Sequence, residues 1–183
     1  MPRYYIKKED FKIVHLDEIK QYIEASDRED MRILLMLSWL TGARISELLE
    51  LKKSNFSIGK NYVTILIHSK KHGKVGYPTF SFNDPFVTDV LEYIKDKGED
   101  ERIFRCGKRR YQQILLQLNK KLHGEDKSKY ITFHYLRHSR LTYLARVLGA
   151  MPEELKSWTG HKSTAFEEYF APRRVRRFAG KIK

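Results

Sequence analysis

Cysteine is almost absent from this sequence. The single cysteine, Cys106, cannot form an internal disulfide, and it cannot build a metal site from several thiolates. The chain also lacks internal repeats and low-complexity segments. These absences exclude disulfide-stapled, collagen-like and repeat proteins, and they fit a reducing compartment.

Long hydrophobic runs are absent as well. The longest apolar run, residues 33–40, is interrupted by Ser38 and is far shorter than the ~20 residues that a bilayer-spanning helix needs. No signal peptide precedes it. We therefore expect no membrane span and a location in the cytoplasm, or in the cytoplasm of a host cell if a virus or plasmid encodes the chain.

Acidic residues are scarce only in the second part of the chain. Residues 1–100 hold 16 basic and 16 acidic side chains, whereas residues 101–183 hold 20 basic and 7 acidic ones, so the net charge of +13 arises there. Because 41% of the residues are hydrophobic and 13% aromatic, this charge belongs to a folded protein. A basic surface of this kind favours a nucleic acid as partner, although an inert solvated face stays open on charge alone.

Hydrophobic periodicity predicts a mainly α protein with a small antiparallel β-sheet (α+β). Helices are predicted at residues 16–25, 27–40, 44–51, 85–97, 109–122, 134–148, 152–158 and, as a short piece, 164–170. Residues 61–68 and 75–82 are β-branched and aromatic, and the polar turn SKKHGK separates them. We expect these two segments to pair as a hairpin.

An arginine interrupts an apolar helical line in TGARISELLEL. Arg44 shares its predicted line with Leu48 and Leu51, where a charge is costly without a partner. Glu47 lies three residues further on and could neutralise it. The pattern therefore fits two interpretations: a structural ion pair between Arg44 and Glu47, or an arginine that functions in a catalytic or binding site.

The segment HYLRHSRLTYLARVLG repeats this feature. Arg137 heads a stripe continued by Leu141, Leu144 and Leu148, and His134 lies one turn earlier on the same side. In the first turn of a helix, both side chains would join exposed backbone N–H groups, which suits a phosphate. A buried core histidine is the alternative.

The segment GHKSTAFEEYF follows near the carboxyl end. It contains His161 after a glycine, and Tyr169 in an amphipathic stretch with Phe166 and Phe170. Tyrosine commonly lies between core and surface, so Tyr169 alone indicates little.

Taken in order, these motifs resemble the tyrosine recombinase (phage integrase) family over roughly residues 28–171. TGARISELL, a lysine in a hairpin turn, HYLRHS, GHKS and a late tyrosine rarely occur together in this order by chance. The resemblance implies the family's catalytic-domain fold. It also implies a site-specific recombinase or integrase that cleaves and rejoins double-stranded DNA through a 3'-phosphotyrosine, without metal, ATP or another cofactor.

The resemblance also implies a role for each matching residue. Arg44 and Arg137 match the two catalytic arginines, His134 and His161 match further phosphate-contacting positions, and Tyr169 matches the nucleophile.

The family's lysine, which serves as general acid, matches Lys70 best. The adjacent Lys71, or Lys74 within the same turn, could exchange roles with it. Glu47 matches an acidic family position that braces the first arginine.

The remaining basic residues of these segments are candidates for DNA binding. They are Lys71, Lys74, Lys108, Arg109, Arg110, Arg140, Lys162, Arg173 and Arg174. In the family, the segment after the tyrosine often packs on a neighbouring subunit. The apolar residues of the tail 172–183 could therefore support self-association on DNA.

Domain organisation is expected to be simple. Family members generally carry a helical core-binding domain before the catalytic one, whereas about 27 residues precede the first buried helix here. We expect one catalytic domain over residues 1–183, with residues 1–27 as a lead-in and helix, residues 172–183 as a basic tail, and no separate core-binding domain.

Three other functions compete with this interpretation. The first is a non-catalytic DNA-binding or regulatory remnant of the same fold. The second is a metal nuclease using His134 and His138, which the absence of acidic residues from positions 127–152 disfavours. The third is a type IB topoisomerase, because it shares the chemistry.

Overall fold

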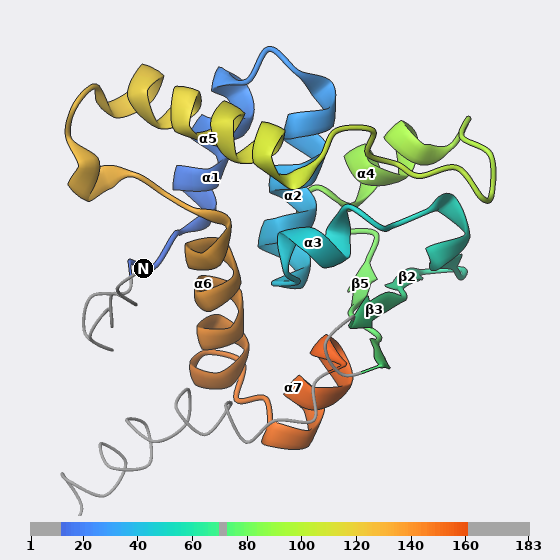
Figure 1. The fold of residues 1–183 in the computed structure, drawn as a ribbon. Helices are drawn as coiled ribbons and strands as arrows, with labels where there is room; N and C mark the ends of the chain where they lie inside the picture. The colour runs from blue at the N-terminus through green and yellow to red at the C-terminus, as the bar shows by residue number, and fades with distance from the viewer. Residues whose placement is uncertain (1–11, 70–72, 161–183) are drawn as a thin grey trace, which may run out of the picture.

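The computed structural model describes residues 12–69 and 73–160. Its helices within these ranges are α1 (Leu16–Ala25), α2 (Glu29–Thr41), α3 (Ile45–Leu48), α4 (Val87–Ile94), α5 (Lys108–His123), α6 (Phe133–Arg146) and α7 (Pro152–Thr159), with short 3-10 turns η1 (Lys53–Asn55) and η2 (Lys127–Lys129). Its strands are β1 (Phe56–Ile58), β2 (Tyr62–Ile65), β3 (Ile67–Ser69), β4 (Lys74–Gly76) and β5 (Thr79–Ser81). The small sheet lies at the right of Figure 1, with α4 above it and α7 below it, and α2 and α6 lie to its left.

The helices lie close to their predicted positions. Two are shorter than expected, since the segments predicted at 44–51 and 85–97 are helical only over Ile45–Leu48 and Val87–Ile94. Strand β1 was not predicted, because three residues are too few for a periodic pattern. The helical piece predicted at 164–170 lies outside the described residues.

The predicted hairpin forms, but it is divided into two ladders. Strand β2 pairs antiparallel with β1 and β5, and β3 pairs antiparallel with β4 in the same register. The division falls at Pro78, which has no N–H to donate, while the N–H of Tyr77 donates to the carbonyl of Ser157 in α7 at 2.9 Å. The hairpin is thereby attached to α7.

Helix α2 occupies the centre of the core. Its residues Leu34, Leu35 and Leu37 are fully buried, and it packs against α1, α4 and α6. Helix α5 crosses the ends of α1 and α2 in Figure 1, and α6 runs beside α2. A smaller apolar cluster joins α6 to α7, and Trp158 packs against both clusters.

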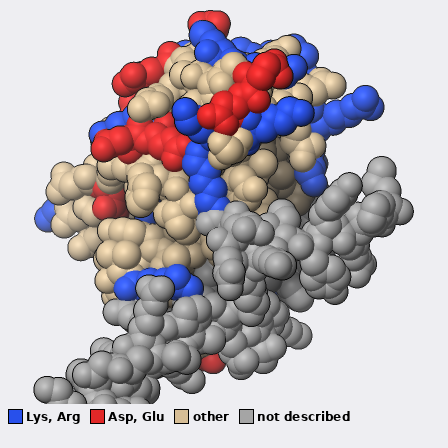
Figure 2. All heavy atoms as spheres, turned by 90° about the vertical axis from the view of Figure 1, so that its left-hand side faces the viewer, with Lys and Arg blue, Asp and Glu red and all other residues tan. Residues whose placement is uncertain are grey.

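No helix among the described residues combines the length and the hydrophobicity that a membrane crossing requires. Figure 2 shows the face that lies at the left of Figure 1. On its described upper part, acidic and basic side chains lie next to each other. This part of the surface is therefore not uniformly basic.

Candidate active site

A cleft of about 530 Å³ lies where α3, α5 and α6 meet. Arg44, His134 and Arg137 all line it, together with Lys108. The structure thus brings together three of the predicted site residues from segments that are far apart in the sequence. The floor and walls include Ile131, Leu115, Asn119 and Phe133.

Arg44 caps α3 instead of lying within a helix. Its backbone is extended, with φ −70° and ψ 143°, and the helix begins at Ile45. The preceding turn contains Gly42 in the left-handed region at φ +63°, which ends α2 and suits glycine. The expected line of Arg44 with Leu48 and Leu51 on one helix face is therefore wrong.

Glu47 holds Arg44 through two hydrogen bonds. The backbone N–H of Arg44 donates to Oε2 of Glu47 at 2.9 Å, and Nη1 of Arg44 donates to Oε1 at 3.2 Å. The Glu47 side chain is 3% exposed, whereas that of Arg44 is 37% exposed. The buried carboxylate therefore orients a guanidinium that remains accessible from the cleft.

Arg137 on α6 is hydrogen-bonded to the turn that precedes Arg44. Its Nη1 donates to the carbonyl oxygen of Gly42 at 2.6 Å. Helix α6 begins just before it, where the hydroxyl of Thr132 accepts the N–H of Tyr135. His134, in this first turn, is exposed and lines the cleft.

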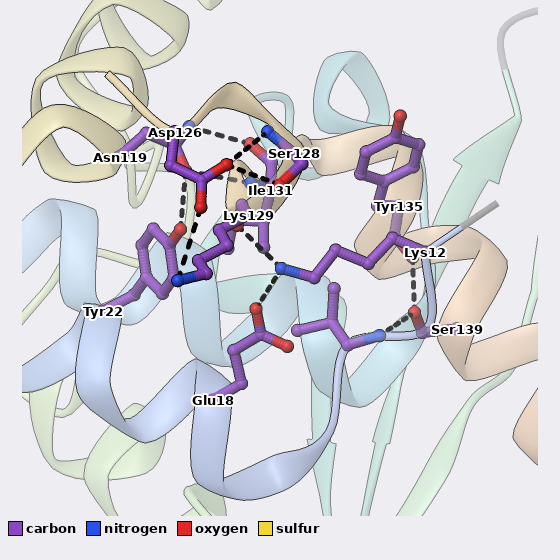
Figure 3. Close-up of polar contacts among 11 residues, drawn as sticks. Lys12, Glu18, Tyr22, Asn119, Asp126, Ser128, Lys129, Ile131, Tyr135 and Ser139 are labelled. Carbon is purple, nitrogen blue, oxygen red and sulfur yellow. Dashed lines mark hydrogen bonds and ion pairs between the residues drawn. The ribbon is translucent and has the colours of Figure 1, made fainter. Parts of the chain in front are cut away.

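A buried amide holds the segment that leads into α6 (Figure 3). Asn119, 3% exposed on α5, accepts from the backbone N–H of Ile131 at 2.8 Å and donates to its carbonyl at 2.9 Å. The hydroxyl of Tyr22 on α1 donates to the same amide oxygen at 2.6 Å. Sequence analysis missed Asn119, because its partners lie far from it along the chain.

Two further contacts in Figure 3 fix the chain before α1 against this region. The N–H of Val14 donates to the hydroxyl of Ser139 on α6 at 2.7 Å. Lys12 pairs with Glu18 and donates to the carbonyl of Lys129 at 2.7 Å. The chain before α1 is thereby held against the middle of α6 and against η2.

His138 is half-buried on α6, one turn after His134. Burial, and then electrostatic interaction with His134 and Arg146, lower the pKa of His138 to about 4. His138 is therefore neutral at pH 7.

The remaining predicted residues differ in their placement. Lys74 on β4 and Arg109 and Arg110 on α5 are exposed and do not line the cleft, in contrast to Lys108. Arg140 is directed into the protein, where its Nε donates to the carbonyl of Trp39 at 2.6 Å. Lys70, Lys71, His161, Lys162, Tyr169, Arg173 and Arg174 lie outside the described residues.

Two glycines bring β4 into direct backbone contact with the end of α7. A Cβ added to Gly76 would lie 2.5 Å from the carbonyl oxygen of Trp158, and one added to Gly160 would lie 2.7 Å from the nitrogen of Gly76. The lysine-bearing hairpin and the chain just before His161 are thus in contact. Gly160 belongs to the GHKS motif, whereas Gly76 was not singled out in the sequence.

Among residues 12–69 and 73–160, no three His, Cys, Asp or Glu side chains are grouped as a metal site requires.

Comparison with known proteins identifies relatives of this chain. A family model described as "Phage integrase family" matches residues 12–172. The tyrosine recombinase XerA of Pyrococcus furiosus is 26% identical over 136 residues, which are 70% of this chain and 46% of that protein. The chain therefore spans about half the length of this relative.

Solved structures share the fold. The XerH site-specific recombinase, bound to difH substrate in a pre-cleavage complex, aligns with a TM-score of 0.67 at 20% identity and covers 91% of this chain and 52% of that one. The XerA recombinase aligns with the same TM-score at 22% identity, and that alignment covers 94% of this chain and 64% of XerA. The mainly α fold class with a small antiparallel sheet, predicted from the sequence, is confirmed.

Proposed function

This chain belongs to the phage integrase family, and we propose that it is a site-specific recombinase or integrase that cleaves and rejoins double-stranded DNA through a 3'-phosphotyrosine. The observation that carries this proposal is the cleft shared by Arg44, His134 and Arg137. Three groups able to hold a phosphate converge there, although their segments are separated by about half of the chain.

The two arginines hold the phosphate that is cleaved. A guanidinium stays charged and can contact two oxygens at once, so Arg44 and Arg137, which both line the cleft, can bind the nonbridging oxygens. Their own positions are fixed by Glu47 and by the carbonyl of Gly42. Because these groups are oriented before substrate binds, they stabilise the charge that develops as the phosphate is attacked.

The nucleophile in this proposal is Tyr169. Its phenol oxygen attacks phosphorus and forms a bond to it, while the bond from phosphorus to the 5'-oxygen breaks. The phosphate then joins the tyrosine to the 3'-oxygen of the cleaved DNA strand. Lys70, or Lys71 or Lys74 in its place, gives the leaving oxygen its proton. A free tyrosine has a pKa of about 10, so His134 takes the phenol proton or supports its loss.

Rejoining reverses these steps. A 5'-hydroxyl attacks the phosphotyrosine, so the energy of the original bond is conserved and ATP is not needed. His161 contacts a nonbridging oxygen in both directions.

Basic side chains around the cleft hold the flanking DNA in this proposal. Lys108 lines the cleft, and Arg109 and Arg110 extend from the same exposed turn of α5. Each phosphate contact releases condensed counterions, so DNA affinity falls as salt rises. Lys162, Arg173 and Arg174 are proposed to extend this contact.

The tail 172–183 is proposed to support self-association on DNA. It alternates basic residues with Val175, Phe178 and Ile182. A chain lacking residues 172–183 separates two roles. Loss of self-association with unchanged DNA affinity supports the protein contact, whereas unchanged self-association with weaker DNA binding contradicts it.

Covalent capture tests the proposed function. The full chain is incubated with a pool of nicked duplexes of randomised sequence, because a nick lets the 5'-hydroxyl strand depart and traps the intermediate. We expect a denaturant-resistant adduct with the wild type, with or without a chelator, and none with Tyr169→Phe.

Other outcomes identify the competing functions. DNA binding without an adduct in either protein indicates a non-catalytic module. Cleavage that a chelator abolishes indicates a metal nuclease, and relaxation of supercoiled DNA without strand exchange indicates a topoisomerase.

A further inference from the structure

The carboxyl end of α2 is capped by side chains from α6 and α7. Nε of Arg140 donates to the carbonyl of Trp39 at 2.6 Å, and the indole N–H of Trp158 donates to the carbonyl of Thr41 at 2.7 Å. The last carbonyls of a helix have no partner within the helix. These two donors therefore complete the end of α2 from outside.

The guanidinium of Arg140 is also enclosed by aromatic rings. Its central carbon lies 3.9 Å from the centre of the Trp39 ring and 5.5 Å from that of Tyr143. Burial lowers the pKa of Arg140 to about 10, because desolvation disfavours the charged form. A cation at this position also complements the negative end of the α2 dipole.

Arg140 contacts the turn that leads to Arg44. A Cβ added to Gly42 would lie 3.1 Å from both Cβ and Cγ of Arg140, so α6 approaches this turn closely. The carbonyl of Gly42 accepts from Arg137, which lies one helical turn before Arg140. Arg137 and Arg140 thus bind the carbonyls of Gly42 and Trp39, three residues apart at the end of α2, and Arg44 follows two residues after Gly42.

We propose that Arg140 is a positioning residue for DNA cleavage, which fixes Arg44 and Arg137 relative to each other by fastening the end of α2 to α6. This inference rests on the proposed function. It replaces the expectation that Arg140 contacts DNA. Lysine could supply the charge but not the flat guanidinium that stacks on Trp39.

The test compares Arg140→Gln with Arg32→Gln in the full chain. Arg32 is a matched control, because it lies on α2 and also donates to a backbone carbonyl, that of Ser26, at 3.0 Å. The first readout is the NMR signals of the side-chain Nε–H groups of Arg44 and Arg137 without DNA. We expect both signals to shift in Arg140→Gln and to stay unchanged in Arg32→Gln.

The second readout is the rate of adduct formation at saturating nicked duplex. A displacement of about 1 Å at a reacting group can lower a rate about 100-fold, so we expect a fall of roughly 10- to 100-fold with little change in DNA affinity. In an Arg137→Ala background, Arg140→Gln should have little further effect, because the two changes act through one element.

Several results would overturn the inference. The first two are unchanged NMR signals of Arg44 and Arg137 in Arg140→Gln, and an undiminished rate of adduct formation. The third is a loss of rate on adding Arg140→Gln to Arg137→Ala that equals the loss caused by Arg140→Gln alone. The fourth is weaker DNA binding at an unchanged rate. If Arg140→Gln does not fold, Arg140→Lys is used, for which we expect the same shifts and a smaller loss of rate. If the wild type forms no adduct, the proposed function fails, and the NMR readout alone decides whether Arg140 positions the two arginines.

Discussion

Arg137 donates from Nη1 to the carbonyl oxygen of Gly42 at 2.6 Å, across 95 positions of sequence. Gly42 ends α2 and lies two residues before Arg44. The bond therefore joins the two segments that carry the arginines of the proposed site. It also gives Arg137 a fixed orientation before any DNA is bound.

Removing either arginine should slow cleavage far more than it weakens DNA binding. We expect Arg44→Ala and Arg137→Ala each to lower the rate of adduct formation roughly 100-fold or more, the usual cost of losing an oriented donor to a developing oxyanion. Arg102→Ala is the control, since Arg102 is exposed and paired with Glu50. Wild-type rates in both variants would refute the proposed clamp.

The buried carboxylate of Glu47 should stabilise both the fold and the site. Glu47→Ala leaves the N–H of Arg44 without its acceptor and removes the buried partner of the guanidinium. We expect the free energy of unfolding to fall by about 2 kcal/mol, with slower cleavage. Denaturant titration measures the change.

Glu50→Ala provides the comparison for Glu47. Glu50 forms a surface ion pair with Arg102, which is worth at most about 1 kcal/mol. Equal losses of stability in the two variants would contradict the role given to the buried carboxylate.

The contact between Gly76 and α7 predicts a steric effect. Gly76→Ala would place a Cβ 2.5 Å from the carbonyl oxygen of Trp158 and 2.8 Å from the nitrogen of Gly160. Because both neighbours are backbone atoms, we expect a loss of about 1–3 kcal/mol in the free energy of unfolding. Gly98→Ala, whose Cβ would meet Glu101 at an ordinary 3.8 Å, should be nearly neutral. A neutral Gly76→Ala would show that β4 does not pack on α7 in this way.

His138 predicts a loss of stability in acid. Its pKa is about 4 in the folded protein against 6.5 in the unfolded chain, so the unfolded chain binds the proton more readily between these values. The free energy of unfolding should therefore fall by about 2 kcal/mol as the pH drops from 6.5 to 4. Urea titrations across this range measure it, and His138→Gln should flatten the decline. An equal decline in the variant would assign it to other groups.

The sequence predicted most of the helices, because α1, α4 and α5 have a clear amphipathic pattern and α2 is a long apolar segment that ends at Gly42. The residues 16–25 are helical as predicted, and the ends of α5 and α6 differ by one or two residues. The break in the hairpin at Pro78 could have been predicted from the sequence, since proline has no N–H to donate to a β-ladder. Strand β1 was not, because its pairing with β2 depends on tertiary packing.

The order of the sequence motifs predicted that Arg44, His134 and Arg137 lie together, and all three line one cleft in the structure. Their roles, and those of Lys70, His161 and Tyr169, stay predictions. The placement of Arg140 could not be foreseen, because its partner Trp39 lies 101 positions away. A basic residue in a basic segment is expected at the surface unless a distant partner is known.

The most direct test is a crystal structure of Tyr169→Phe bound to a nicked duplex recovered by covalent capture with the wild type. We expect the guanidinium groups of Arg44 and Arg137 both to lie within hydrogen-bonding distance of one phosphate, at the cleavage position. Guanidinium groups on different phosphates, or a cleavage position outside the cleft, would contradict this expectation.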